Sequence, residues 1–494
     1  MVGDGAGSYR VEGQALPSAL IYNRLGVNNP ILNLTYEPAF QTLGDDYSDV
    51  VAAAEFPQHI LRFRNDALFS LLGLDPDQVS DRHIVQALGQ FQERSPLLAM
   101  RYHGHQFGEY NPHIGDGRGF LYGQVRGTDG KLYDLGTKGS GPTPYSRGGD
   151  GRLTLKGGVR EILASEALHR QGVTTSRILS LVETGDQLWR GDEPSPTRAS
   201  VMVRLNRGHI RFGTFERLHY LGRSDLARQL LDHVVAIYYP HIKGKDDAYA
   251  RCYDELVQRT AQMAAGWMAA GFCHAVINSD NMSITGESFD YGPYAFISTY
   301  DPKFTAAYFD YGGRYRYENQ PLACRWNLHM LQLVLKGVIP AEAMEESLEA
   351  YEMHYQQAYR ERMTNRLGLA ADSLSVSTEL VSATVEMLHK TQVSYHGFFS
   401  DLCQQASSQW QASDDAIAAA LSLPNEPSAQ RWVTLYRLAL TQEPSFEAIA
   451  TRLAQHNPKT VPVRPEIEAV WEPIVATDDW DPLYALLDRI REEG

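Results

Sequence analysis

The sequence predicts an α+β fold of two lobes, a strand-rich N-lobe followed by a mostly helical C-lobe. From about 96 to 205, Gly-rich turns alternate with short strand-like runs, and from about 206 onward apolar residues recur at helical spacing. A loop rich in Asp and Asn, 278–292, falls near the junction. We therefore expect an extension packed on the body at 1–95, an N-lobe at 96–205, and a C-lobe at 206–494 that ends in a helical tail.

The composition is that of an ordinary globular protein. The 494 residues suffice for two or three domains or one bilobal enzyme. The formal net charge of −15 argues against a nucleic-acid binder but leaves room for a nucleotide held by local cations. Four cysteines without close pairing predict neither a zinc site nor a disulfide scaffold, and reduced thiols in a cytoplasmic protein are expected. We see no signal-peptide pattern and no apolar run of about 18 residues, so no membrane span is expected.

The elements can be justified in chain order. Residues up to about 95 mix loops with short amphipathic segments such as 66–72. Strand-like runs at 120–126 and 131–138 flank the sequence Gly-Thr-Asp-Gly at 127–130, which predicts a hairpin. A helix is expected around 159–170.

The second half is predicted to be helical. Leu256, Thr260, Met263 and Trp267 fall at helix spacing just before the Asp-Asn loop. Further helices are expected at 343–363, 371–391, 393–411, 428–441 and 477–492. A strand-rich lobe, a helical lobe and a metal-binding hairpin near their junction are together typical of a protein-kinase-like bilobal fold.

The loop Asn-Ser-Asp-Asn-Met-Ser-Ile at 278–284, followed by Asp-Tyr-Gly at 290–292, is the most informative stretch. If Thr285-Gly286 forms a two-residue turn, Asn281 faces Asp290 across a hairpin. Opposed Cβ atoms then lie about 5 Å apart, which suits two oxygen ligands of one Mg²⁺. Asp280 remains free to act as a base. These are the components of a phosphate-transferring site.

Asp-Asn pairs also form turns and helix caps, because their side chains bond nearby backbone. A second Asp-Tyr-Gly, at 310–312, has no Asp-Asn pair ten residues upstream. We therefore interpret Asp290 as the ligand and Asp310 as structural.

Two Gly-rich loops are candidate phosphate contacts. Gly115-Asp-Gly-Arg-Gly119 precedes a strand, so its backbone amides can approach phosphates closely while Arg118 adds a cation; a plain turn is the alternative. Asp150-Gly151 lies in a similar loop, which either touches a nucleotide or connects the lobes.

A lysine at a strand end and a glutamate on the next helix form a second candidate. Lys138 aimed at nucleotide phosphates needs a carboxylate to hold its flexible chain, and Glu161 is placed to supply it, as in kinases. Surface pairing is the alternative, and Lys156 and Glu166 are nearby rivals.

Arg204 and Arg211 form a third candidate, because guanidinium forks recognise phosphate oxygens. Two such cations are more than ordinary phosphotransfer needs, which hints at an unusual orientation of the phosphate chain.

Two rival sites carry less weight. His103, His105 and His113 lie in a Gly-rich loop without Cys or carboxylates at ligand spacing, so we expect them to bond backbone groups rather than zinc. No Gly-x-Ser-x-Gly nucleophile elbow is apparent.

Long strings of residues resemble the selenoprotein O family, whose bacterial members include the YdiU proteins. The resemblance covers nearly the whole chain and is densest from about 100 to 330. The strings are Tyr-His-Gly-His-Gln-Phe-Gly at 102–108, Gly-Asp-Gly-Arg-Gly at 115–119, Gly-Ser-Gly-Pro-Thr-Pro-Tyr-Ser-Arg-Gly-Gly-Asp-Gly-Arg at 139–152, Arg-Phe-Gly-Thr-Phe-Glu at 211–216 and Asn-Ser-Asp-Asn-Met-Ser at 278–283.

The resemblance implies a protein-kinase-like fold that transfers AMP, and in some members UMP, to protein hydroxyls. It implies ATP or UTP bound in a flipped orientation, Mg²⁺ or Mn²⁺ as cofactor, and Ser, Thr or Tyr acceptors, with pyrophosphate released. By motif, the nucleotide contacts are Gly115, Gly117, Arg118, Lys138, Asp150, Gly151, Arg204, Arg211 and Asp290; the proton acceptor is Asp280; the metal ligands are Asn281 and Asp290; and Glu161 supports the lysine.

The chain departs from the family pattern in two places. Its last cysteine is Cys403, and Ala306 stands where some bacterial members have a Cys that pairs with one near the C-terminus. Redox control of that kind is therefore not expected here. Two alternatives to nucleotidyl transfer stay open at this stage: an ordinary kinase that transfers the γ-phosphate, and a nucleotide-binding scaffold without catalysis.

Overall fold

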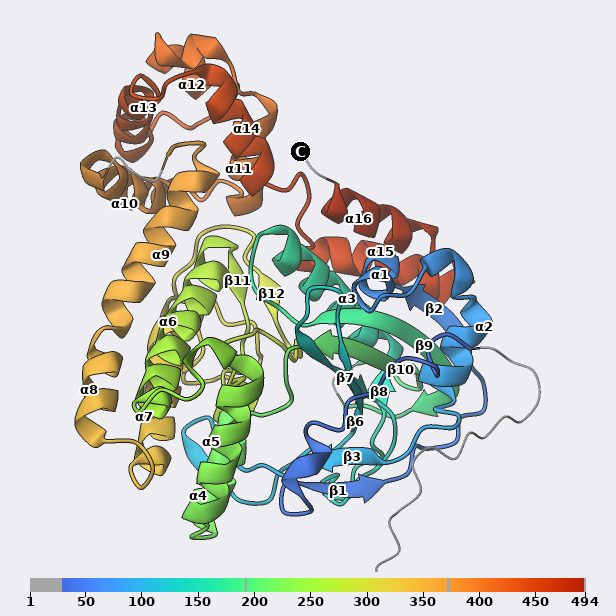
Figure 1. The fold of residues 1–494 in the computed structure, drawn as a ribbon. Helices are drawn as coiled ribbons and strands as arrows, with labels where there is room; N and C mark the ends of the chain where they lie inside the picture. Colours follow the sequence, from blue (N-terminus) through green and yellow to red (C-terminus); the bar gives the residue numbers. More distant parts are fainter. Residues whose placement is uncertain (1–28, 192, 371–373, 493–494) are drawn as a thin grey trace, which may run out of the picture.

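A computed structural model describes residues 29–191, 193–370 and 374–492. Its centre is an antiparallel sheet flanked by helices (Figure 1). In spatial order the strands are β1 (Ser48–Val51), β3 (Leu97–Met100), β6 (Leu121–Arg126), β7 (Leu132–Lys138), β10 (Thr197–Asn206), β9 (Arg177–Leu188) and β2 (Ile60–Arg64), and the short β8 (Leu153–Thr154) pairs with β10. Two-stranded pairs are formed by β4 (Gly104–Gln106) with β5 (Glu109–Asn111) and by β11 (Phe272–Cys273) with β12 (Ala295–Phe296).

The hairpin predicted at 127–130 is confirmed. Strands β6 and β7 pair antiparallel, with Arg126 opposite Leu132 at the end of the ladder. Gly130 has a φ of +76°, a left-handed conformation that favours glycine.

The segment expected to be an extension contributes both edges of the sheet. Strand β1 pairs with β3 at one edge, and β2 pairs with β9 at the other. Residues up to 95 therefore complete the sheet instead of only covering it. The sequence did not reveal this, because strands of four or five residues carry little periodicity.

Helices make up most of the second half of the chain and surround one end of the sheet (Figure 1). Near the sheet lie α1 (Asp66–Leu71), α2 (Asp81–Ile84) and α3 (Leu155–Arg170). The following helices are α4 (Phe212–Tyr220), α5 (Ser224–Tyr238), α6 (Ala248–Ala269), α7 (Gln320–Leu335), α8 (Ala341–Glu349), α9 (Tyr351–Arg366), α10 (Leu374–Thr391), α11 (Tyr395–Gln404), α12 (Asp414–Ala420), α13 (Pro427–Leu440), α14 (Phe446–His456), α15 (Arg464–Thr477) and α16 (Asp481–Arg491).

The expected helices are present, but several limits differ. The helix predicted at 343–363 is two helices, α8 and α9, separated at Ala350. The one predicted at 393–411 ends at Gln404, and a short 3-10 turn follows at 408–411. The helix predicted from 477 starts only at Asp481, because α15 ends at Thr477 and Asp478 takes a left-handed conformation. Residues 371–373 of the predicted 371–391 helix lie outside the described residues.

The hairpin predicted around Thr285-Gly286 is wrong. Asn281 lies in a single 3-10 turn, Ser279–Asn281, and does not pair with Asp290. Instead the segment after this turn pairs with the residues just before α4, since the amide of Ile284 donates to the carbonyl of Ile210 at 3.0 Å.

The second half of the same loop also finds another partner. The Ser288 amide donates to the Thr174 carbonyl at 3.0 Å, and the Ser176 amide donates back to Ser288 at 2.9 Å. The indole of Trp267 on α6 donates to the Ser288 hydroxyl at 2.9 Å. Two pairings with distant segments therefore satisfy the backbone hydrogen-bonding groups that a local hairpin would have paired with each other.

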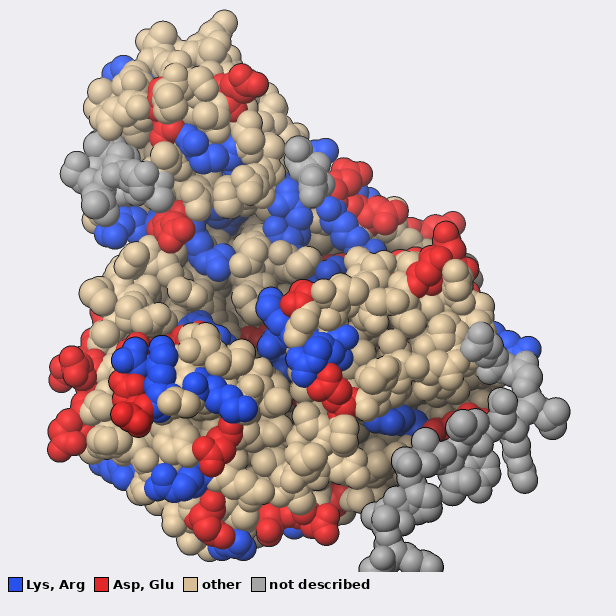
Figure 2. Space-filling model, in the orientation of Figure 1, with Lys and Arg blue, Asp and Glu red and all other residues tan. Residues whose placement is uncertain are grey.

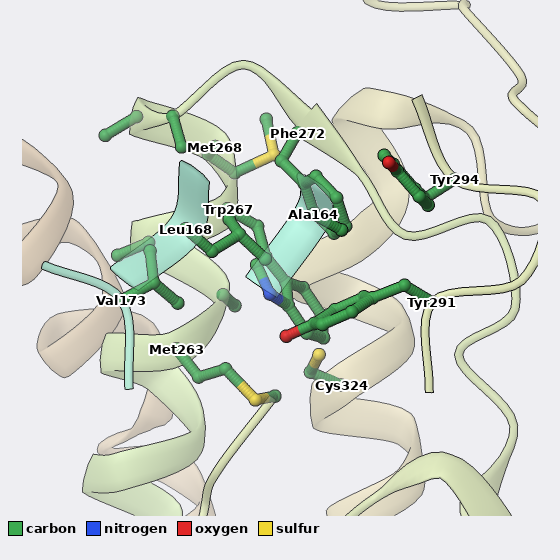
Figure 3. Close-up of a cluster of buried hydrophobic side chains, with 14 of the residues drawn as sticks. Ala164, Leu168, Val173, Met263, Trp267, Met268, Phe272, Tyr291, Tyr294 and Cys324 are labelled. Carbon is green, nitrogen blue, oxygen red and sulfur yellow. The ribbon is translucent and has the colours of Figure 1, made fainter. Parts of the chain in front are cut away.

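A tightly packed core joins the sheet part to the helical part. Figure 3 shows Ala164 and Leu168 of α3 close to Met263 and Trp267 of α6, with Cys324 of α7 beside them. All five are at least 95% buried. The four residues predicted to form one face of a helix before the Asp-Asn loop all lie in α6 and are buried, which confirms that prediction.

The last two helices return to the sheet (Figure 1). Arg491 of α16 donates to buried Glu166 of α3 at 2.7 Å, and Asp478 accepts from Arg198 of β10 at 2.6 Å. At the start of α15, Arg464 donates to the carbonyl of Ala306. The predicted helical tail is therefore attached to both parts of the molecule.

The structure confirms a mixed fold with an antiparallel sheet and many helices. The kinase-like assignment and the domain limits stay predictions. In the part of the chain that the structure describes, no helix is both long enough and apolar enough to cross a membrane.

The ion pairs of Glu166 generate a stability prediction. Burial would raise the pKa of this carboxyl, but Arg177 and Arg491 outweigh that effect and hold it below its usual value. Glu166 therefore stabilises the fold above about pH 4.3, and this contribution is lost as the pH falls through the lower, folded-state pKa. We expect Glu166→Gln to lower the free energy of unfolding at pH 7 by about 2–4 kcal/mol, measured by urea denaturation.

Glu468→Gln is the matched control, because Glu468 pairs with Lys156 at 2.7 Å on the surface. A change of at most about 1 kcal/mol is expected for it. Equal effects of the two substitutions at pH 7 would contradict the role assigned to Glu166.

Candidate active site

A cavity of about 370 Å³ opens where the sheet meets the helical part. Ten of the residues singled out from the sequence line it: Gly115, Gly117, Arg118, Lys138, Asp150, Gly151, Arg204, Arg211, Asp280 and Asp290. Glu161 and Asn281 do not line it, but Glu161 accepts from the lining residue Lys138, and Asn281 follows the lining residue Asp280 in the chain. The structure thus brings together segments spread over about 175 positions of the chain.

The glycine loop at 115–119 enters β6 through a crowded passage. A Cβ on Gly115 would lie 2.5 Å from the ring of Tyr145, and one on Gly119 would lie 2.1 Å from the carbonyl oxygen of Thr137. Only glycine fits at these two positions. The loop therefore passes close to its neighbours and presents Arg118 to the cavity.

Lys138 lies at the end of β7 between two carboxylates. Its Nζ donates to Glu161 of α3 and to Asp290, and its side chain is 8% exposed. The predicted Lys138–Glu161 pair is therefore formed. The additional bond to Asp290 was not predicted, because it depends on a loop 152 residues away.

Asp290 has a φ of +66°, a conformation that is uncommon outside glycine and Asn or Asp. Burial raises the pKa of this carboxyl, but the surrounding cations Lys138, Arg204, Arg211 and Arg118 together hold it well below its usual value. Asp290 is therefore ionised at neutral pH, as a metal ligand or anchor must be.

Arg204 and Arg211 are both buried on the inner wall of the cavity. Arg204 projects from β10, and its Nε and Nη1 have no hydrogen-bond partner among the described residues although the side chain is 5% exposed. Arg211, at the start of α4, donates to the carbonyl of Asp280 at 2.9 Å and to Asp116 at 3.2 Å. Buried guanidinium groups whose N–H donors lack partners can bind an anion without first breaking other hydrogen bonds.

Asp280 lies in the 3-10 turn that follows β11. Burial raises its pKa to about 6, although Arg211 opposes the shift. Gln106 approaches one of its oxygens at 3.4 Å, while Oδ1 is buried without a partner among the described residues. A carboxyl with a raised pKa and a free oxygen suits proton transfer near neutral pH.

The residues present fit a divalent cation that shares its coordination with phosphates. The side-chain NH2 group of Asn281 donates to the carbonyl of Val276 at 3.0 Å. This bond fixes the side chain and leaves Oδ1 available as a metal ligand. Within the described ranges no group of three or more His, Cys, Asp or Glu side chains is placed to hold a metal. Mg²⁺, however, commonly takes one or two carboxylates and completes its shell with phosphate oxygens and water.

The loop at 150–151 lies at the outer rim. Asp150 pairs with Arg190 at 2.9 Å, so its carboxylate is already engaged. Gly151 has a φ of +67°, and a Cβ there would lie 2.1 Å from the backbone of Gly141. Of the two roles considered for this loop, contact with a ligand or a simple connection, its position on the cavity wall favours the first.

The rival residues have other partners. Lys156 pairs with Glu468, and Glu166 with two arginines. Asp310 accepts from the amides of Arg314 and Tyr315 at 2.9 and 2.8 Å, as expected for a structural residue. His103 and His105 contact side chains, Tyr110 and Glu216, rather than the backbone groups that we expected.

Sequence reasoning missed several residues of the cavity wall. Asp116 accepts a hydrogen bond from Arg211 and lies inside the 115–119 glycine loop. Its place in that loop could have identified it as a site residue. Tyr145 packs against that loop and donates to Asp49. The other lining residues that were not assigned a role are Tyr102, Gln106, Ile114, Gly119, Thr137, Ser146, Arg147, Gly149, Arg152 and Arg190.

Comparison with known proteins shows the family of this chain. The sequence pattern described as "Protein adenylyltransferase SelO" matches residues 30–491. The chain belongs to the SelO family. It is 59% identical over 468 residues to the protein nucleotidyltransferase YdiU of Gloeobacter violaceus, covering 94% of this chain and 96% of that one. It is 58% identical to the protein of the same name from Synechococcus elongatus, with the same coverage, and 39% identical to that of Pseudomonas putida F1 over 75% of this chain and 76% of the relative. Membership of the SelO family supports nucleotidyltransferase activity and a nucleoside triphosphate substrate.

The lysine between two carboxylates gives a test of the site's electrostatics. Lys138→Met should lower the free energy of unfolding by about 3–5 kcal/mol, because it leaves buried Glu161 without its cation and removes one of the cations that surround Asp290. The double variant Lys138→Met/Glu161→Gln should lose less than Lys138→Met alone, since one of the uncompensated charges is gone. Urea denaturation of both variants and of Glu161→Gln measures the coupling. If the double variant is as unstable as the sum of the single ones, the two residues do not interact as described.

Proposed function

We propose that this chain transfers AMP from ATP, or UMP from UTP, to a Ser, Thr or Tyr hydroxyl of a protein and releases pyrophosphate. The observation that carries the proposal is the excess of cations in one cavity. Seven cationic side chains and four aspartates line it, and four of the cations, Lys138, Arg118, Arg204 and Arg211, surround Asp290. Among the described residues, two donor atoms of Arg204 have no hydrogen-bond partner. Pyrophosphate is a more highly charged leaving group than ADP, which leaves in a kinase reaction, so this excess of cations supports cleavage at the α-phosphorus.

The proposed mechanism uses the side chains that line the first cavity. The hydroxyl oxygen of the acceptor attacks the α-phosphorus, the bond from that phosphorus to the bridging oxygen breaks, and the electron pair leaves with pyrophosphate. Asp280 takes the hydroxyl proton, for which its raised pKa of about 6 is suited. Arg204 and Arg211 stabilise the charge that develops on the leaving group, and Glu161 keeps Lys138 in position.

A divalent cation, Mg²⁺ or Mn²⁺, would be held by Asn281 and Asp290. When bound, it would neutralise charge on the phosphates next to the reacting phosphorus. The kinase-like fold is part of the same proposal. It is supported by Asp280 in the cavity lining, with Asn281 next to it in the same 3-10 turn, and by a strand lysine held by a helix glutamate, the pattern that kinases use.

The position of the radioactive label distinguishes this reaction from ordinary phosphorylation. The full-length chain is incubated with a mixture of soluble bacterial proteins and Mg²⁺, and with ATP labelled on either the α- or the γ-phosphate. We expect protein-bound label from the α-phosphate only. Label from the γ-phosphate would identify a kinase, and label from neither would fit a nucleotide-binding scaffold.

Substitution of the two candidate carboxylates tests the roles of individual residues. Asp280→Asn and Asp290→Asn should each lower the rate of label transfer by about 10²-fold or more, since one removes the proton acceptor and the other a metal ligand and an anchor of Lys138.

Asp310→Asn is the matched control, from the second Asp-Tyr-Gly of the chain. Because Asp310 only supports the 310–315 turn, this variant should have a lower melting temperature but a transfer rate within a few-fold of the original. Full activity of Asp290→Asn together with inactivity of Asp310→Asn would reverse the assignment.

A further inference from the structure

A second cavity, of about 530 Å³, lies beside the connection from β10 to α4. It is lined by the tip of the β6–β7 hairpin, the end of α5, the middle of α6 and the 285–287 turn. None of its lining residues also lines the candidate active site. On the face shown in Figure 2, Lys and Arg side chains gather where helices α5 and α6 adjoin the sheet.

The lining of this cavity is mainly cationic. Five of its side chains are Lys or Arg, and the one acidic residue is Glu287. Three of the cations have carboxylate partners outside the cavity lining, and two, Arg207 and Arg362, have none in the ion pairs of the described residues. The five are Arg126, Lys131, Arg207, Arg259 and Arg362.

Two polar groups of the lining are buried without partners. Tyr238 is 4% exposed, and its hydroxyl makes no hydrogen bond with any described residue. The same holds for Nη1 of Arg207, whose guanidinium lies 5.1 Å from the ring of Tyr133. Buried donors without acceptors are unfavourable and rare in native proteins, so such a pair in one cavity points to a ligand that accepts from both.

The Tyr238 hydroxyl lies beside the backbone segment that carries Arg207. A Cβ on Gly208 would lie 2.7 Å from the Tyr238 hydroxyl, so this hydroxyl rests on the residue next to Arg207. Gly208 therefore leaves the room that the hydroxyl needs. A guanidinium and a phenol hydroxyl that line the same cavity can both donate to the oxygens of a phosphate.

Glu287 does not cancel the positive charge. Its carboxyl is 5% exposed and accepts from the Arg207 amide at 2.9 Å, so it is tied to the backbone of the same segment. Burial raises its pKa to about 7, although Arg207 and Arg204 oppose the shift. At neutral pH it therefore carries only part of its charge.

We propose that this cavity is a second ligand site, which binds a small organic phosphate through Arg207 and the Tyr238 hydroxyl. A free phosphate ion shares the recognised chemistry but would leave most of the volume unfilled. A phosphate joined to a sugar-sized body therefore fits the cavity better. The proposal does not depend on the function proposed for the first cavity.

Calorimetric titration of the full chain with ribose 5-phosphate and, separately, with inorganic phosphate tests the proposal. Both probes should bind, ribose 5-phosphate more tightly. Tyr238→Phe removes only the hydroxyl and should weaken ribose 5-phosphate binding by about tenfold, and Arg207→Gln by at least as much. Tyr253→Phe is the matched control. It removes another buried hydroxyl, which donates to the Leu328 carbonyl at 3.1 Å, and Tyr253 lines neither cavity, so binding should be unchanged.

The variant Arg204→Gln tests whether the probes bind in the first cavity, which Arg204 lines. If binding of both probes is lost in Arg204→Gln and unchanged in Tyr238→Phe, the phosphate occupies the first cavity and the proposal fails. It also fails if neither probe binds the original chain at millimolar concentration. Melting temperatures of the variants show whether each remains folded, and Tyr238→Phe should, because its hydroxyl makes no bond that folding would lose.

Discussion

The arrangement of this protein depends on one buried charge cluster, Lys138 between Glu161 and Asp290. An ammonium taken out of water is tolerated only if opposite charges meet it at short range. Strand β7, helix α3 and the loop after α6 must therefore approach one another at this point. The cluster fixes where the sheet meets the helices, and that junction is where the first cavity opens.

Next to this satisfied cluster lie groups that are not satisfied. Within the described part of the chain, Arg204 has buried donors without a hydrogen-bond acceptor, and Asp280 has a buried oxygen without a donor. Such groups lower stability, and they persist at sites that bind ligands because the ligand supplies the missing partners. The packed core around Trp267 offsets that loss, since it holds α3 and α6 together independently of the cavity (Figure 3).

Local patterns in the sequence predicted local structure well. The 127–130 turn, the helix before the Asp-Asn loop and the Lys138–Glu161 pair all follow from spacing within short segments, and all three are present. The hairpin at 285–286 was wrong, because its two halves pair with segments far along the chain. The edge strands at 48–64, the partition at Ala350 and the bond from Lys138 to Asp290 could not be predicted either. Each depends on contacts between distant segments, which no local pattern records.

The return of α15 and α16 to the sheet bears on how the chain folds as it is synthesised. Glu166 of α3 lacks its partner Arg491 until α16 has been synthesised. The edge strand β2 contacts the residue that follows α15, since Arg62 pairs with Asp478. These contacts span more than 300 positions, so the first-made part of the protein cannot reach its final packing until α15 and α16 have been synthesised. A nascent chain stalled before α15 would expose arginine-binding carboxylates and an uncovered sheet edge, features that chaperones recognise and that favour aggregation.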